Sequence, residues 1–145
     1  MRIAIGSDHA GFPLKEEVIQ WLQKEEIRVL DQGTFSLESV DYPDFASKVA
    51  VSVLEKEVDC GILICGSGNG MAMAANKYAD IRAALCWTAE IASLAKQHND
   101  ANILVMPGRF LQVDEAIGIV KAYLSAEFEG GRHQGRVNKM KVLKQ

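Results

Sequence analysis

The sequence predicts an α/β fold in which a five-stranded parallel sheet carries helices on both of its faces. Two observations carry this prediction. Short β-rich runs alternate with longer amphipathic stretches five times along the chain, a pattern typical of a parallel sheet with helices on both faces. The run 59–65 is also almost continuously apolar, as expected of a strand that is buried on both faces.

Each expected strand is followed by an expected helix. Pro13 opens the first helix and places Leu14, Val18 and Leu22 on one of its faces. The expected strands are residues 2–6, 27–31, 59–65, 81–86 and 102–106, and the expected helices are residues 13–25, 43–56, 69–77, 88–97 and 112–124. No linker or internal repeat interrupts this order, so residues 1–145 are expected to form a single domain.

The C-terminal segment 126–145 is set apart by a break at Gly130 and Gly131. A helical pattern resumes after the break, with an apolar stripe at Val137, Met140 and Leu143. Such a terminal helix can pack on its own domain or on a partner subunit. The pattern alone leaves both arrangements open.

Composition narrows the range of partners and compartments. The formal net charge is −3. The basic segment 129–145 follows an acidic remainder of the chain, and so few positive charges are only a weak indication of nucleic-acid binding. A small anion or an acidic neighbouring subunit explains this basic segment more simply. The three cysteines lack the spacing of a disulfide framework, which favours a reducing, cytoplasmic setting. No apolar run approaches the roughly 20 residues of a membrane span, so no membrane partner is expected.

The strongest local signal is the segment Cys65-Gly66-Ser67-Gly68-Asn69-Gly70, which follows the most apolar strand. Ligands of open parallel sheets bind beyond the carboxyl ends of the strands. Alternating glycines let the backbone approach a ligand closely, and the N–H groups of such a turn favour negative charge. Met71 stands where a dinucleotide-binding fingerprint has glycine and where a cysteine phosphatase has arginine. The alternative is a tight turn beside a buried thiol.

Four further groups are candidates for binding or catalysis. They are Asp8 and His9 after the first strand, His98 and Asn99 before the fifth, Arg109 after the fifth, and the cluster of Arg132, His133 and Arg136 near the C-terminus. Each group also has a structural reading: a turn that caps a helix, a histidine on a helix dipole, or solvated charge. The three histidines are scattered along the sequence and no Cys or His pair has metal-ligand spacing, so no metal site is predicted.

Seven segments together give the chain a specific resemblance to a known family. They are Gly-Ser-Asp-His-Ala-Gly-Phe (6–12), Asp-Tyr-Pro-Asp-Phe-Ala (41–46), Gly-Ile-Leu-Ile-Cys-Gly-Ser-Gly-Asn-Gly (61–70), Ala-Ala-Asn-Lys (74–77), Ile-Arg-Ala-Ala (81–84), His-Asn-Asp-Ala-Asn (98–102) and Glu-Gly-Gly-Arg-His-Gln-Gly-Arg-Val (129–137). In this order they resemble the sugar-phosphate isomerases that include the type B ribose-5-phosphate isomerases and the galactose-6-phosphate and allose-6-phosphate isomerases. The resemblance spans nearly the whole chain.

The resemblance implies a Rossmann-like fold, a three-layer α/β/α sandwich. It also implies active sites shared between the subunits of a homodimer or homotetramer, with the C-terminal helix reaching the partner. It also implies that an aldose phosphate and a ketose phosphate interconvert through an enediolate without a cofactor. The implied catalytic residues are Cys65 as the base, Ser67 as its assistant and His98 for opening of the sugar ring. The implied substrate-binding residues are Asp8 and Asn99 at the hydroxyls, Gly66, Gly68, Asn69 and Gly70 at the enediolate, and His9, Arg109, Arg132 and Arg136 at the phosphate.

Met71 decides between two branches of this family. One branch carries a glutamate as the base directly after Gly-Asn-Gly, and this chain has Met71 there, which favours the cysteine branch. Ribose 5-phosphate is the expected substrate, in the pentose phosphate pathway, and a hexose 6-phosphate is the alternative. A flavodoxin-like nucleotide-binding module is a rival of another class. A catalytically inactive subunit is a further rival, and the joint presence of Cys65, Asp8 and His98 speaks against it.

Overall fold

A computed structural model describes residues 1–141 of the chain. It contains one sheet of five parallel strands in the order β2-β1-β3-β5-β4, which confirms the predicted fold class. The strands are β1 (Arg2–Ser7), β2 (Arg28–Asp31), β3 (Cys60–Cys65), β4 (Ala83–Leu85) and β5 (Ile103–Pro107). The apolar strand β3 lies at the centre of the sheet, as its burial on both faces requires.

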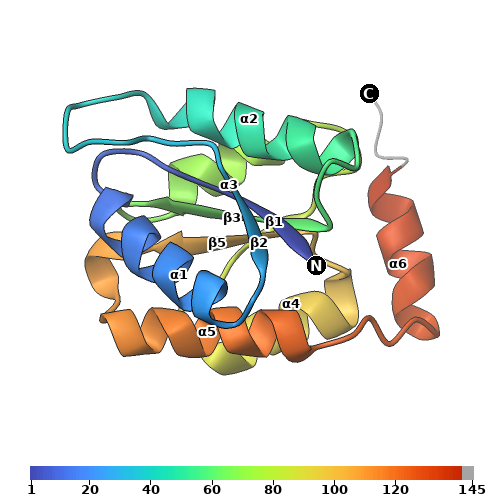
Figure 1. Cartoon of the computed structure of the whole chain (residues 1–145). Coiled ribbons are helices and arrows are strands. Elements are labelled where there is room, and N and C mark those ends of the chain that lie inside the picture. Colours follow the sequence, from blue (N-terminus) through green and yellow to red (C-terminus); the bar gives the residue numbers. More distant parts are fainter. Residues whose placement is uncertain (142–145) are drawn as a thin grey trace.

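Helices cover both faces of this sheet (Figure 1). The helices are α1 (Phe12–Lys24), α2 (Tyr42–Leu54), α3 (Asn69–Ala75), α4 (Ala89–Asn99), α5 (Val113–Ser125) and α6 (Arg132–Lys141). Helices α1, α4 and α5 lie on one face of the sheet, and α2 and α3 lie on the other. Helix α6 stands apart, beside the end of the sheet at which the strands begin.

Alternation along β3 divides the buried side chains into two apolar cores. Ile62 and Ile64 join the core beneath α1, α4 and α5, whereas Leu63 and Cys65 join the core beneath α2 and α3. The thiol of Cys65 therefore belongs to the layer of α3, the helix that begins four residues later. The place of Cys65 as the last residue of β3 therefore determines at which end of the strand, and on which face of the sheet, its thiol lies.

The element boundaries agree with the sequence prediction to within a few residues, with two differences that matter. A short 3₁₀ helix at Gly108–Phe110, which the sequence analysis did not predict, follows β5. Helix α4 also extends to Asn99, so His98 and Asn99 are helical instead of lying in the expected loop. The helix ends there because Asp100 adopts a left-handed conformation, with φ of 48°.

Helix α6 packs partly against its own domain. His133 and Val137 are its buried side chains, while Arg132, Arg136 and Met140 are exposed. Part of the predicted apolar stripe is thus covered within one chain, and Leu143 lies outside the described residues.

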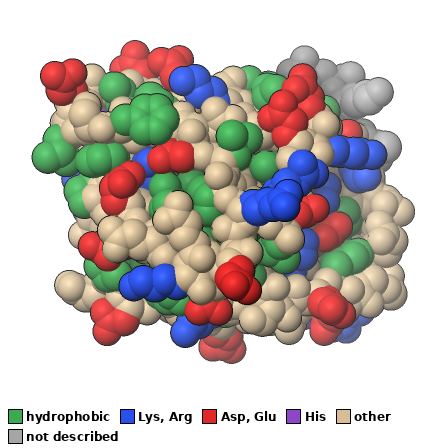
Figure 2. All heavy atoms as spheres, viewed as in Figure 1, with side chains coloured by type: hydrophobic (Ala, Val, Ile, Leu, Met, Phe, Trp, Pro, Cys, Tyr) green, Lys and Arg blue, Asp and Glu red, His purple; other side chains and the backbone are tan. Residues whose placement is uncertain are grey.

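The opposite end of the sheet carries an exposed apolar loop. Phe35 and Leu37 lie between β2 and α2 and are each 68% exposed. Hydrophobic side chains gather over this loop at the upper left of Figure 2. None of the helices within residues 1–141 has the length and apolar character needed to cross a membrane.

Candidate functional site

Three neighbouring strands bring the first group of predicted site residues to one edge of the sheet. Asp8 follows β1, Cys65 ends β3, and Arg109 follows β5. The three strands are adjacent and parallel, so their carboxyl ends meet at the same edge. We call this group, together with His9 and the loop Gly66–Gly70, the carboxyl-edge group. It occupies the position at which ligands of open α/β sheets bind.

The loop after Cys65 is shaped by glycine. Gly68 has a φ of 79°, and an added Cβ there would collide with the side chain of Leu85. This turn leads directly into α3, whose first-turn N–H groups have no acceptor within the helix. The hydroxyl of Ser67 accepts a hydrogen bond from the backbone N–H of Asn69 at 3.4 Å and another from its Nδ2 at 3.2 Å. The loop thus presents backbone donors beside a thiol.

Cys65 differs in placement from the other two cysteines. Its side chain is buried, with 4% of the residue exposed, at the strand end that faces the glycine loop. Cys60 begins the same strand at the opposite edge, and burial raises its pKa to about 11. Burial likewise raises the pKa of Cys86 to about 12. Both of these thiols stay protonated and unreactive at neutral pH.

Local hydrogen bonds orient Asp8 and His9. The carboxylate of Asp8 accepts the N–H of Gly11 at 3.0 Å, and the N–H of Asp8 donates to the carbonyl of Ile64 at 3.3 Å. The Nδ1 atom of His9 accepts the N–H of Val40 at 3.2 Å. The proton of the neutral ring is therefore on Nε2, where it can be donated to an anionic ligand.

Arg109 and Tyr42 lie directly against the glycine loop. The backbone N–H of Arg109 donates to the carbonyl of Gly66 at 3.0 Å, and its exposed guanidinium lies beside the same glycine. The ring of Tyr42 covers Gly70 so closely that an added Cβ would lie 2.6 Å from it. Sequence reasoning did not single out Tyr42 as a site residue. Its only signal was its place in the Asp-Tyr-Pro-Asp-Phe-Ala segment.

The remaining predicted residues lie at the other edge of the sheet. His98 and Asn99 end α4, which runs back to the start of β5, and α6 stands at the same edge (Figure 1). We call His98, Asn99, Arg132 and Arg136 the amino-edge group. Strand β3 has six residues, so the two edges are roughly 20 Å apart at about 3.3 Å per residue. This distance exceeds the length of an extended pentose phosphate.

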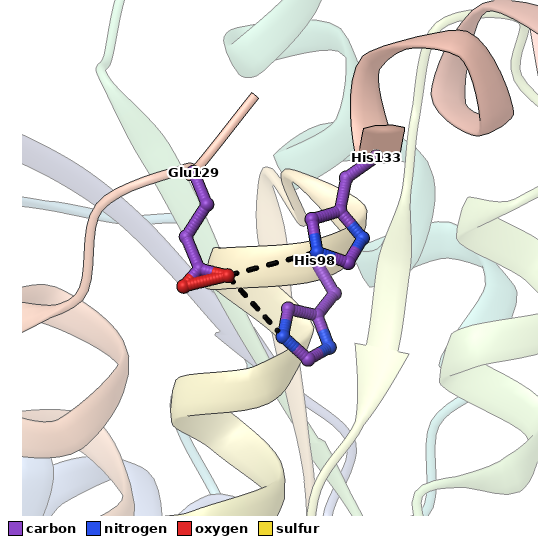
Figure 3. A group of neighbouring side chains, drawn as sticks. All are labelled: His98, Glu129 and His133. Atoms are coloured by element: carbon purple, nitrogen blue, oxygen red, sulfur yellow. Dashed lines mark ion pairs between the residues drawn. The ribbon is translucent and has the colours of Figure 1, made fainter. Parts of the chain in front are cut away.

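The amino-edge group is assembled by contacts that sequence spacing did not reveal. The imidazole rings of His98 and His133 stack with centroids 4.2 Å apart and planes 10° apart. Glu129 lies between α5 and α6 and directs its carboxylate at both rings (Figure 3). Sequence reasoning missed Glu129 as a functional candidate. Its signal is a position four residues before His133 in the same segment.

The arginines of both groups are available to an anion. Arg109, Arg132 and Arg136 are exposed, and within residues 1–141 none of them forms an ion pair with a carboxylate. A guanidinium offers paired N–H donors that suit phosphate oxygens. One such side chain stands at the carboxyl edge and two stand at the amino edge.

Comparison with known proteins agrees with the sequence motifs and the fold. The ribose/galactose isomerase family profile matches residues 3–140. The chain is 48% identical to ribose-5-phosphate isomerase B of Escherichia coli over 144 residues, which covers 99% of this chain and 97% of that protein.

Solved structures give the same result. A ribose 5-phosphate isomerase of Thermotoga maritima superimposes with a TM-score of 0.96 at 54% identity and 97% coverage of both chains. The Mycoplasma genitalium ribose-5-phosphate isomerase B, solved with bound ribulose-5-phosphate, gives a TM-score of 0.92 at 44% identity, over 97% of this chain and 93% of that one. The chain therefore belongs to the ribose/galactose isomerase family.

Proposed function

We propose that this chain, a sugar-phosphate isomerase by family, interconverts ribose 5-phosphate and ribulose 5-phosphate through an enediolate, with Cys65 as the base. The observation that carries the proposal is the position of Cys65 at a strand's carboxyl end, beside the amides of Gly66–Gly70. The curated and solved relatives that carry the name ribose-5-phosphate isomerase B support the choice of sugar.

The isomerisation requires a base and hydrogen-bond donors that stabilise the negative charge developing on the enediolate oxygen. The Cys65 thiolate removes the proton from C2 of the open aldose and returns it to C1, while a proton moves from O2 to O1. Amides of the glycine loop donate to the enediolate oxygen, and each such donor is worth about 2.7–4 kcal/mol. Ser67 assists the thiol. Asp8 holds a sugar hydroxyl, and no redox cofactor takes part because only protons move.

The two residue groups complete one site when two subunits meet. A site within one chain would have to span roughly 20 Å, so we place the carboxyl-edge group of one subunit against the amino-edge group of its partner. His98 of the second chain then opens the furanose ring by giving a proton to the ring oxygen as the bond between C1 and that oxygen breaks. The hydroxyl on C1 releases its proton to solvent and becomes the aldehyde, and Asn99 holds a sugar hydroxyl. His9 and Arg109 of the first chain and Arg132 and Arg136 of the second surround the phosphate.

Two features of the surface support such a dimer. The apolar loop with Phe35 and Leu37 is exposed at the carboxyl edge, where a partner would cover it. Arg132 and Arg136 are exposed although their helix is anchored through His133 and Val137, so their guanidinium groups can point to another chain. A tetramer would arise by pairing two such dimers.

A hexose phosphate of the same family, allose 6-phosphate or galactose 6-phosphate, is the second candidate substrate, because the family profile covers galactose isomerases as well. The test incubates the pure chain with ribose 5-phosphate and the two hexose 6-phosphates and compares kcat/KM. We expect ribose 5-phosphate to give the highest value. A higher value for a hexose phosphate would reassign the substrate, and no turnover of any of them would refute the proposal.

Chelation provides a prediction about the mechanism. Dialysis against EDTA should leave kcat and KM for ribose 5-phosphate unchanged or slightly improved, because the thiol, the amides and the arginines supply every group that the reaction needs. The measurement compares initial rates before and after dialysis. Loss of activity that a divalent ion restores would show that the reaction depends on a metal.

A further inference from the structure

Three side chains at the amino edge converge on one point (Figure 3). The Nε2 atom of His98 lies 3.4 Å from Oε1 of Glu129, and the Nε2 atom of His133 lies 3.6 Å from the same oxygen. All three potential ligand atoms lie within 4.8 Å of one another. Among the described residues 1–141, this is the one group of three His, Cys, Asp or Glu side chains arranged in this way.

We propose that His98, Glu129 and His133 form a binding site for a zinc-type divalent ion, and that the bound ion inhibits the enzyme. The inhibitory part rests on the proposed function, in which His98 acts on the sugar ring. Two imidazole nitrogens and one carboxylate oxygen are a donor set that zinc takes, with water in the fourth position. Bonds of about 2.0–2.1 Å in a tetrahedral site separate the ligand atoms by about 3.3–3.4 Å. The two nitrogen–oxygen separations are already close to this value.

The stacked rings must tilt for both nitrogens to face one ion, because a metal bond to imidazole lies near the ring plane. The exposed side chains have room for this adjustment: His98 is 38% exposed and Glu129 is 51% exposed. The ring of His133 is only 9% exposed and serves as the fixed member. Small rotations of two side chains therefore convert the stack into a chelating pair.

The backbone holds the three ligands in place. The N–H of Glu129 donates to the carbonyl of Gln97 at 3.0 Å, which ties the carboxylate-bearing residue to the end of α4. The N–H of His133 donates to the carbonyl of Gly130 at 3.0 Å. Gly130 and Gly131 both have positive φ and turn the chain so that Glu129 and His133 face His98.

The surrounding charges act in two directions. Loss of solvent around His133 is the largest cause that lowers its pKa, followed by the nearby His98 and by Arg132, with a smaller contribution from Arg136; Glu129 opposes the shift. Arg132 and Arg136 repel a cation, whereas the Glu129 carboxylate attracts it.

The test measures binding of Zn²⁺ to the untagged full chain by isothermal titration calorimetry, with Co²⁺ absorption as an independent readout. We expect one ion per chain and a Kd that rises about 10-fold or more in Glu129→Gln and His133→Asn, the loss typical of disturbed metal ligation. Glu127→Gln is the matched control: this exposed glutamate is two residues away and its loss should leave Kd unchanged. Thermal unfolding of each variant shows whether it is folded.

Cys65→Ala separates this site from zinc bound to a thiol. We expect it to keep the zinc affinity, and the Co²⁺ spectrum to lack thiolate charge-transfer bands. Loss of binding in Cys65→Ala, or its retention in folded Glu129→Gln, would overturn the site.

The inhibitory part predicts that ribose 5-phosphate and Zn²⁺ weaken each other's binding. If the chain turns over ribose 5-phosphate but that sugar and Zn²⁺ bind independently, the metal site is supported and the proposed inhibition is refuted. If the chain does not use that sugar, the calorimetric result still decides the metal site.

Discussion

Replacing Cys65 with alanine should lower kcat for ribose 5-phosphate by a factor of about 10² to 10⁴ while KM stays nearly constant. General-base catalysis contributes a factor of this size. The substitution removes an interaction that is made in the transition state, and the groups that hold the phosphate and the hydroxyls remain. Steady-state kinetics of the purified variant measure both constants.

The other two cysteines are the matched controls for this prediction. Cys60→Ala and Cys86→Ala should leave kcat within a few-fold of the unmodified chain, because burial raises the pKa of both thiols to about 11 and about 12. Both are buried, so melting temperatures are compared as well. A Cys65→Ala enzyme with nearly full activity would rule out the thiol as the base.

Mixing two inactive variants should restore activity if the active site is shared between subunits. Cys65→Ala removes the base from the carboxyl-edge group, and Arg136→Ala removes a phosphate ligand from the amino-edge group. In a two-fold symmetric mixed dimer, one of the two sites carries both lesions and the other carries neither. Each mixed dimer should therefore reach at most about half of the unmodified activity. The measurement is the initial rate after subunit exchange.

A second pair of variants provides the control for this experiment. Cys65→Ala and Arg109→Ala both alter the carboxyl-edge group, so every site of their mixed dimer carries one lesion and no activity should return. Native mass spectrometry confirms that subunits have exchanged in both mixtures. If Cys65→Ala and Arg136→Ala fail to complement after exchange, both residues serve a site within one chain.

The sequence predicted the fold and the carboxyl-edge group because both depend on local pattern. The apolar run 59–65 predicts strand β3. The carboxyl ends of adjacent parallel strands lie at the same edge of a sheet, so the residues that follow β1, β3 and β5 must lie together there. Even the position of Cys65 before the turn at Gly68 follows from sequence order alone.

The amino-edge group could not be predicted in this way because it depends on long-range packing. Helix α4 extends to Asn99 through the left-handed Asp100, which moves His98 out of the expected loop. The stack of His98 on His133 joins residues 35 positions apart (133 − 98) and depends on how α6 docks on α4. Likewise, Tyr42 at the start of α2 contacts Gly70 in α3, and no periodic pattern in the sequence predicts that these two helices lie close together.

Isomerisation in deuterated water tests the central claim most directly. The enediolate mechanism passes the C2 proton of ribose 5-phosphate to the Cys65 thiolate, and the thiol that forms exchanges its proton with solvent before a proton is returned to C1. Incubation to equilibrium over many turnovers should therefore place deuterium at C1 of ribulose 5-phosphate, measured by NMR, and Cys65→Ala should abolish this incorporation. Complete isomerisation without deuterium in the sugar would mean direct transfer of hydrogen between C2 and C1, and would contradict both the enediolate and the role of Cys65.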